Sequence, residues 1–127
     1  MKKTIIALLT IFPAYQALAV DCENAQTQLV MNQCASAEYK KADNELNKIY
    51  KEIVKRASDE QARSLKIAQH KWIEYRDSDC EFQTSKYREG SIYPMIHAYC
   101  MANKTTDRIK EFKRMLNCEE GDMSCPL

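Results

Sequence analysis

Neither glycine nor proline occurs between residues 20 and 89, and this absence limits the possible folds of the chain most strongly. Only Gly90, Pro94, Gly121 and Pro126 follow. A protein built from short strands needs turn residues about every 8–12 positions, whereas the interior of a long helix needs none. The sequence therefore predicts an all-α fold, a small antiparallel bundle of three to five helices.

Apolar residues recur at steps of three and four along this region, as in amphipathic helices. Ser58 is followed three residues later by Gln61, a capping-box pattern that marks the start of a helix. Ser91 is a second candidate cap, for the last helix. The expected helices cover residues 26–33, 37–56, 58–87 and 91–116, the last with an interruption near 103–106, and an irregular tail begins at about 118.

The first 19 residues have the features of a signal peptide. Lys2 and Lys3 precede a short apolar run, and Ala17 and Ala19 form the small-x-small pattern of a cleavage site. We expect cleavage near Ala19, a single mature domain over residues 20–127 and a periplasmic or secreted product without stable membrane insertion. Asp21 stands where a lipoprotein signal needs a small residue, so lipid attachment is not expected.

Charge and motifs exclude several classes of function. Without Lys2 and Lys3 the chain has 17 basic and 18 acidic residues, and no basic patch indicates nucleic-acid binding. No serine-hydrolase, zinc-protease or phosphate-loop motif occurs. The two histidines, His70 and His97, form no catalytic or metal-binding pattern. We therefore expect no enzymatic activity, no metal and no cofactor.

Six cysteines lie in the predicted mature chain, and an even number in an oxidising compartment indicates three disulfides. Short connections near 57–59 and 88–91 make consecutive helices antiparallel, which sets Cys80 opposite Cys100. A Cys22–Cys34 bond requires a turn, because one unbroken helix would hold these residues roughly 18 Å apart. Cys34–Cys80 remains its competitor. The six cysteines are Cys22, Cys34, Cys80, Cys100, Cys118 and Cys125.

A polar stripe lies on the core side of the third expected helix. Gln69, Trp72, Arg76 and Cys80 recur at helical spacing, and an arginine on a core-facing stripe needs a partner. Antiparallel pairing places Asp43 within about one turn of Arg76. We expect an Asp43–Arg76 ion pair beside Trp72, with hydrogen bonds from Asn47 and Gln69. Glu74 and Asp77 are expected to be solvated charges on the outward face.

Much of this pattern is shared with a known family. The shared residues are Cys22, Met31, Asn32, Cys34, Ala35, Tyr39, Ala42, Asp43, Leu46, Asn47, Tyr50, Gln69, Trp72, Arg76, Asp77, Cys80, Gly90, Ser91, Cys100, Thr105 and Arg108. At this spacing the chain resembles the LprI-type lysozyme-inhibitor family over about residues 22–112. The resemblance implies a small secreted, disulfide-bonded helical domain that inhibits lysozyme. The tail with Cys118 and Cys125 lies beyond the shared pattern.

Two exposed segments are candidates for partner binding. Tyr93 lies in the helix connection 88–94, and Cys118–Cys125 would close a loop containing Glu119, Glu120 and Asp122. Acidic groups there would attract a cationic lysozyme-like peptidoglycan hydrolase. Two alternatives stay open: an immunity protein that neutralises a cell-wall-degrading effector toxin, and an envelope interaction module without a hydrolase partner.

Overall fold

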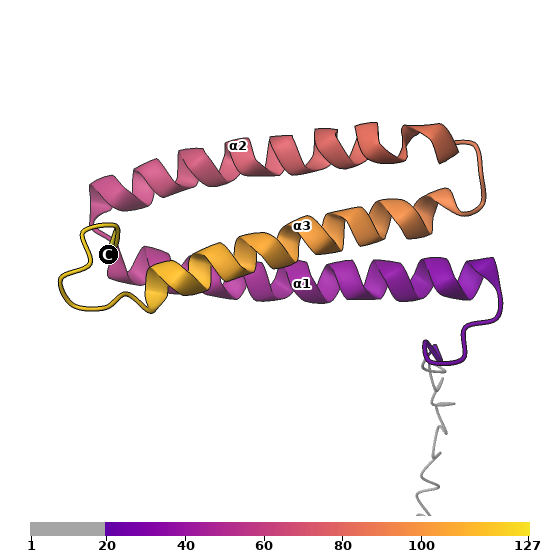
Figure 1. Cartoon of the computed structure of the whole chain (residues 1–127), viewed down its shortest axis with the longest axis horizontal. Coiled ribbons are helices and arrows are strands. Elements are labelled where there is room, and N and C mark those ends of the chain that lie inside the picture. The colour runs from indigo at the N-terminus through magenta and orange to yellow at the C-terminus, as the bar shows by residue number, and fades with distance from the viewer. Residues whose placement is uncertain (1–19) are drawn as a thin grey trace, which may run out of the picture.

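The computed structural model describes residues 20–127 as three long α-helices joined by short connections (Figure 1). Helix α1 covers Gln28–Arg56, α2 covers Asp59–Thr84 and α3 covers Tyr93–Leu116. A 3-10 turn, η1 (Ser85–Tyr87), extends α2, and no strand forms among the described residues. The expected all-α, disulfide-stabilised bundle is confirmed. The predicted signal peptide lies outside the described residues.

The chain reverses direction twice, so α1 and α3 run parallel to each other and α2 runs antiparallel to both (Figure 1). Helices α1 and α3 approach most closely, and α2 is held further from α1. The apolar core follows this arrangement, because its buried members come from α1 and α3. They are Leu46, Ile53, Ile109 and Phe112.

Helix α1 corrects the expectation of two separate helices over 26–33 and 37–56. It is continuous from Gln28, because the sequence contains no glycine or proline to break it. The side chain of Thr27 accepts a hydrogen bond from the Val30 amide and caps its start. The turn required for the Cys22–Cys34 bond lies before the helix, in residues 20–27.

The predicted capping box of α2 is present. The Ser58 hydroxyl accepts a hydrogen bond from the Gln61 amide at 3.3 Å, and the Gln61 side chain accepts one from the Ser58 amide at 2.8 Å. Each contact satisfies an amide that has no partner within the helix. The connection 57–58 can therefore be short.

Helix α3 differs from expectation at two places. It is uninterrupted at 103–106, because Thr105 is fully buried on its packed side and tertiary contacts outweigh the low helix propensity of that segment. Ser91 does not cap it. Ile92 precedes the first helical residue without a side-chain cap, and Pro94 lies in the first turn, where its missing amide hydrogen costs nothing.

Disulfides lie at both ends of the molecule. The Cα atoms are 5.6 Å apart in Cys22–Cys34, 5.7 Å in Cys80–Cys100 and 5.8 Å in Cys118–Cys125. The predicted Cys80–Cys100 bond is confirmed and joins α2 to α3, and Cys34–Cys80 is excluded. No cysteine among the described residues is free.

Candidate partner-binding surfaces

Arg76 fills the space between α2 and the α1–α3 pair. Only 5% of this residue is exposed, and its guanidinium carbon lies 5.2 Å from the Trp72 ring centroid and 5.4 Å from that of Tyr39. A guanidinium this close to two aromatic rings is attracted to both. Burial raises the pKa of Tyr39, against the lowering effect of the Arg76 charge, so the phenol stays neutral.

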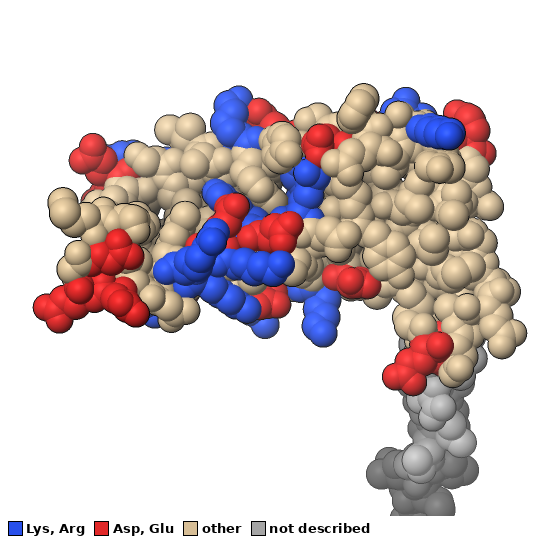
Figure 2. All heavy atoms as spheres, viewed as in Figure 1, with Lys and Arg blue, Asp and Glu red and all other residues tan. Residues whose placement is uncertain are grey.

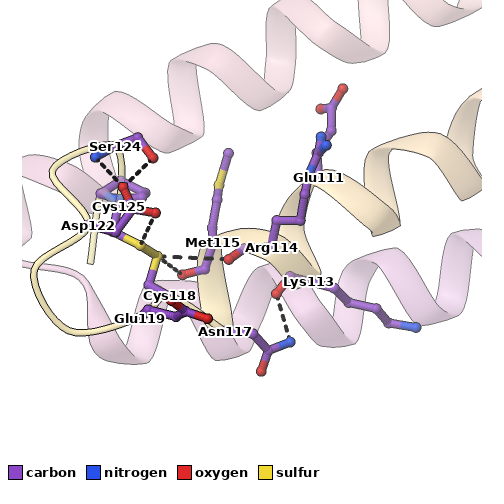
Figure 3. A pocket seen from close by; sticks show the side chains of 11 residues that line it. Glu111, Lys113, Arg114, Met115, Asn117, Cys118, Glu119, Asp122, Ser124 and Cys125 are labelled. Carbon is purple, nitrogen blue, oxygen red and sulfur yellow. Dashed lines mark hydrogen bonds between the residues drawn. A yellow bond between two sulfur atoms is a disulfide. The ribbon is translucent and has the colours of Figure 1, made fainter.

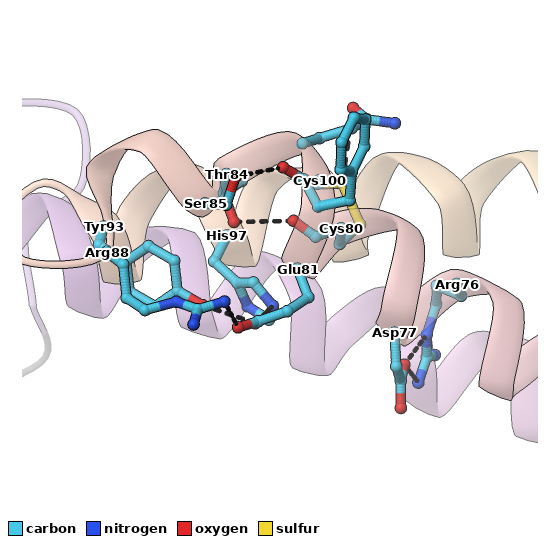
Figure 4. A network of polar contacts seen from close by, with 12 residues as sticks. Arg76, Asp77, Cys80, Glu81, Thr84, Ser85, Arg88, Tyr93, His97 and Cys100 are labelled. Atoms are coloured by element: carbon cyan, nitrogen blue, oxygen red, sulfur yellow. Dashed lines mark hydrogen bonds and ion pairs between the residues drawn. A yellow bond between two sulfur atoms is a disulfide. The ribbon is translucent and has the colours of Figure 1, made fainter.

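Two carboxylates and a hydroxyl satisfy the Arg76 guanidinium. Its Nε donates to Asp77 at 2.8 Å (Figure 4). Its Nη1 lies 3.6 Å from Asp43 and donates to the Thr105 hydroxyl at 3.4 Å. Asn47 donates to the second oxygen of Asp43 at 3.1 Å. Asp77 thus makes the shorter contact, contrary to its expected role as a solvated charge. The Asp43 side chain is 40% exposed, so the pair lies at the margin of the core.

Gln69 binds a different arginine from the one expected. Its side-chain oxygen accepts a hydrogen bond from Arg108 Nε at 3.1 Å. The Arg108 guanidinium carbon also lies 5.7 Å from the Trp72 ring centroid and 4.5 Å from that of Phe112. Sequence reasoning missed this arginine as a member of the network, although Thr105, Arg108 and Phe112 recur at helical spacing. Two arginines, not one, therefore occupy the space between α2 and its neighbours.

Tyr93 belongs to a second polar cluster, centred on Glu81 (Figure 4). Its hydroxyl donates to Glu81 at 2.9 Å, Arg88 pairs with the same carboxylate, and His97 Nε2 lies 3.9 Å from it. The hydrogen bond to Glu81 raises the pKa of the Tyr93 phenol. This side chain is only partly exposed and holds the α2–α3 connection in place. Its availability to a partner is correspondingly reduced.

The acidic loop closed by Cys118 and Cys125 lies at the opposite end of the bundle (Figures 1 and 3). Gly121 has a φ of 89°, a left-handed conformation that suits glycine and turns the loop. Asp122 accepts hydrogen bonds from the Ser124 hydroxyl and amide, which lower its pKa and keep it ionised. Glu119, Glu120 and Asp122 are all exposed.

An open groove of about 720 Å³ lies between this loop and the end of α3. Glu111, Lys113, Arg114, Glu119 and Asp122 contribute charges of both signs to its lining (Figure 3). Exposed groups of mixed sign in an open groove remain hydrated and exert little net electrostatic attraction. The groove alone therefore does not identify a ligand.

The last two residues fold back onto the start of α2. Gln61 donates a hydrogen bond from its side-chain amide to the carbonyl of Pro126. Pro126 and Leu127 border a largely apolar depression of about 420 Å³ with Ile53 and Met115. The tail therefore links the end of α3 to the α1–α2 turn, two segments that no disulfide joins.

Within residues 20–127, no group of three or more His, Cys, Asp or Glu side chains is arranged to hold a metal ion. Every buried side-chain nitrogen or oxygen described by the structure has a hydrogen-bond partner. Among the helices of this region, none combines the length and hydrophobicity that crossing a bilayer requires.

Comparison with known proteins gives one family and one curated relative. The family model described as "Lysozyme inhibitor LprI" matches residues 21–112. An uncharacterized protein of Rhizobium meliloti, R02472, is 36% identical over 114 aligned residues, which cover 80% of this chain and 82% of that protein. No solved structure matches. The family match includes nearly all of the three helices and ends before the Cys118–Cys125 loop.

Proposed function

Because the chain belongs to the LprI family of lysozyme inhibitors, we propose that it binds and inhibits a lysozyme-like peptidoglycan hydrolase without catalysing a reaction. The family match over residues 21–112 carries this proposal. The pattern of Trp72, Arg76 and the cysteines belongs to this match. An inhibitor needs a rigid surface that is already in its binding conformation, and a disulfide-linked helical bundle provides one.

We further propose a periplasmic or secreted location, where peptidoglycan hydrolases act. Three disulfides within residues 20–127 support an oxidising compartment. The apolar run and the Ala17–Ala19 pattern of the first 19 residues agree with export.

The acidic loop is a candidate for attracting a basic hydrolase. Exposed Glu119, Glu120 and Asp122 at one end of the molecule would increase the rate of encounter with a cationic protein. This contribution weakens as salt screens the charges, since it acts between groups in water.

The test is to titrate lysozymes of several classes with the oxidised chain and follow the lysis of cell walls. We expect stoichiometric inhibition of at least one class, with an inhibition constant that rises with salt. The reduced and alkylated chain serves as the control for unspecific effects. No inhibition of any class at micromolar protein would overturn the proposal, and inhibition confined to an effector toxin would favour the immunity-protein alternative.

A further inference from the structure

Charged residues are missing from two stretches of the chain. Residues 24–37 and 91–103 contain no Lys, Arg, Asp or Glu, although 29% of all residues are of these types. Elsewhere in residues 20–127 no uncharged stretch is as long. Such a local depletion of charge on a small, otherwise highly charged protein calls for a physical reason.

The fold brings the two stretches together. Since α1 and α3 are parallel, their first turns lie at the same end of the bundle (Figure 1). Gln28 Nε2 lies 3.7 Å from the sulfur of Met95, and Asn32 Nδ2 donates to the carbonyl of Ser91 at 3.1 Å. Residues 24–37 and 91–103 are called the uncharged end below. Figure 2 shows a broad area there without charged side chains, with charges at its edges.

Apolar and hydroxyl groups are exposed on this surface. Ile92, Ile96, Tyr99 and Asn103 follow one another along one side of α3 at steps of four, three and four residues. Ile92 and Tyr99 are each 37% exposed, and Leu29 on α1 is 67% exposed. The centre of a protein interface is depleted of charge and enriched in tyrosine, and its rim is polar. The uncharged end has this composition.

We propose that the uncharged end is the surface that enters the substrate cleft of the hydrolase. This inference rests on the proposed function and names its binding face. The family match supports it, because residues 21–112 include both uncharged stretches and exclude the acidic loop. A function shared by the family must be carried by residues that the family shares.

The chemistry of the partner supports the same face. A glycoside hydrolase cleft contains two catalytic carboxylates and binds a polysaccharide through hydrogen bonds and apolar contacts. Placing Glu119 and Glu120 beside those carboxylates would bring like charges together, which is unfavourable. The hydroxyl of Tyr99 and the amide of Asn103 carry no charge and resemble the hydrogen-bonding groups of a sugar.

Distance separates the two surfaces. Helix α3 has 24 residues and therefore extends over about 36 Å between the uncharged end and the acidic loop. One narrow cleft cannot hold both. The loop then acts outside the cleft, on the rate of association, and the uncharged end determines the rate of dissociation.

The experiment measures association and dissociation rates for the inhibited hydrolase at low and high salt. Two variants alter the uncharged end: Tyr99→Ala removes the aromatic ring, and Ile92→Asp introduces a charge. Aspartate just before α3 is compatible with folding because the helix dipole favours a negative charge there. Ile67→Asp is the matched control, since Ile67 on α2 is 66% exposed and lies outside the uncharged end. A fourth variant neutralises the loop as Glu119→Gln, Glu120→Gln and Asp122→Asn.

We expect Ile92→Asp and Tyr99→Ala each to raise the dissociation rate at least about tenfold at both salt concentrations, as at an interface centre. Ile67→Asp should stay within about twofold of the original, as is usual away from an interface. The neutralised loop should lower the association rate mainly at low salt. If the original chain inhibits and both end variants inhibit equally well, the inference is wrong and the proposed function stands. If the original chain inhibits no hydrolase, the proposed function is wrong, and so is the partner assigned to the uncharged end.

Discussion

The guanidinium carbon of Arg76 lies 5.2 Å from the centroid of the Trp72 ring, one helical turn away on α2. Arg108 lies 5.7 Å from the same ring and reaches it from α3. One indole therefore contacts two arginines from two helices. A charged planar group on an aromatic face packs well and keeps its edge free for hydrogen bonds, so polar residues serve as core here.

The contacts of the Arg76 guanidinium with two aromatic rings should contribute to the stability of the folded chain. Arg76→Ala should lower the free energy of unfolding by about 2–3 kcal/mol through two lost cation–π contacts and lost packing. The loss stays below the ~3–5 kcal/mol typical of a fully buried pair, because the carboxylates left behind remain in contact with water. Arg76→Lys should recover less than half of it, since an ammonium cannot stack as a plane. Urea unfolding checks this, with exposed Arg63→Ala as the control. Equal stability of Arg76→Ala and the original would contradict the prediction.

The disulfides should differ in their effect on stability. Replacing Cys80 and Cys100 by alanine opens a loop with a sequence separation of 20 that joins α2 to α3, at an expected cost of about 3 kcal/mol. Replacing Cys118 and Cys125 opens a loop with a separation of 7 beyond the end of α3, so the bundle should lose less. Thermal unfolding of the two double variants tests the order. A larger loss for the Cys118–Cys125 pair would show that the tail stabilises the bundle more than the helix crosslink does.

Acid should weaken the contact between α2 and α3 through Asp79. The Lys104 ammonium lies 2.5 Å from the Asp79 carboxylate and lowers its pKa below the ordinary value of 3.8. The Asp79 carboxylate therefore binds a proton less tightly in the folded chain than in the unfolded chain. The stabilisation is therefore present above the ordinary pKa and is lost as the pH falls through the lowered value. Unfolding measured from about pH 6 to about pH 2 should show the difference between the original and Asp79→Asn shrinking in acid. If the stabilities of the two chains change in parallel with pH, the Asp79–Lys104 pair is not the source of the pH dependence.

The helix-capping and tail-binding hydrogen bonds of the Gln61 side chain can be separated by substitution. Its side-chain oxygen caps α2 and its amide group holds the carbonyl of Pro126. Gln61→Glu keeps the acceptor and removes the donor, so α2 should keep its cap while NMR relaxation shows a more mobile backbone at Pro126 and Leu127. Gln61→Ala should also lose the cap, at a cost of about 1 kcal/mol. Unchanged mobility of these two residues in both variants would mean that this hydrogen bond does not hold the tail.

Some tertiary contacts were predictable because short connections between long helices fix their register. Cys80–Cys100 and the proximity of Asp43 to Arg76 followed from this counting. The partner of Gln69 could not be predicted in this way. Arg76 and Arg108, on different helices, both lie near it, and which one reaches it depends on the separation of the helices. The extent of α1 was also missed, because the turn that admits the Cys22–Cys34 bond lies before the helix, where the Asp21 side chain accepts hydrogen bonds from the amides of Glu23 and Asn24.

The helical class, the capping box at Ser58 and the family could be derived from the sequence, because they depend on residues close together in the chain or on spacing alone. The surfaces of the molecule, in contrast, depend on how the helices pack. Residues 24–37 and 91–103 are separate uncharged stretches in the sequence, and they become one end of the molecule because α1 and α3 run parallel. Short connections fix the directions of consecutive helices, but the separation of packed helices follows from the shapes of many side chains together, and no local pattern specifies it.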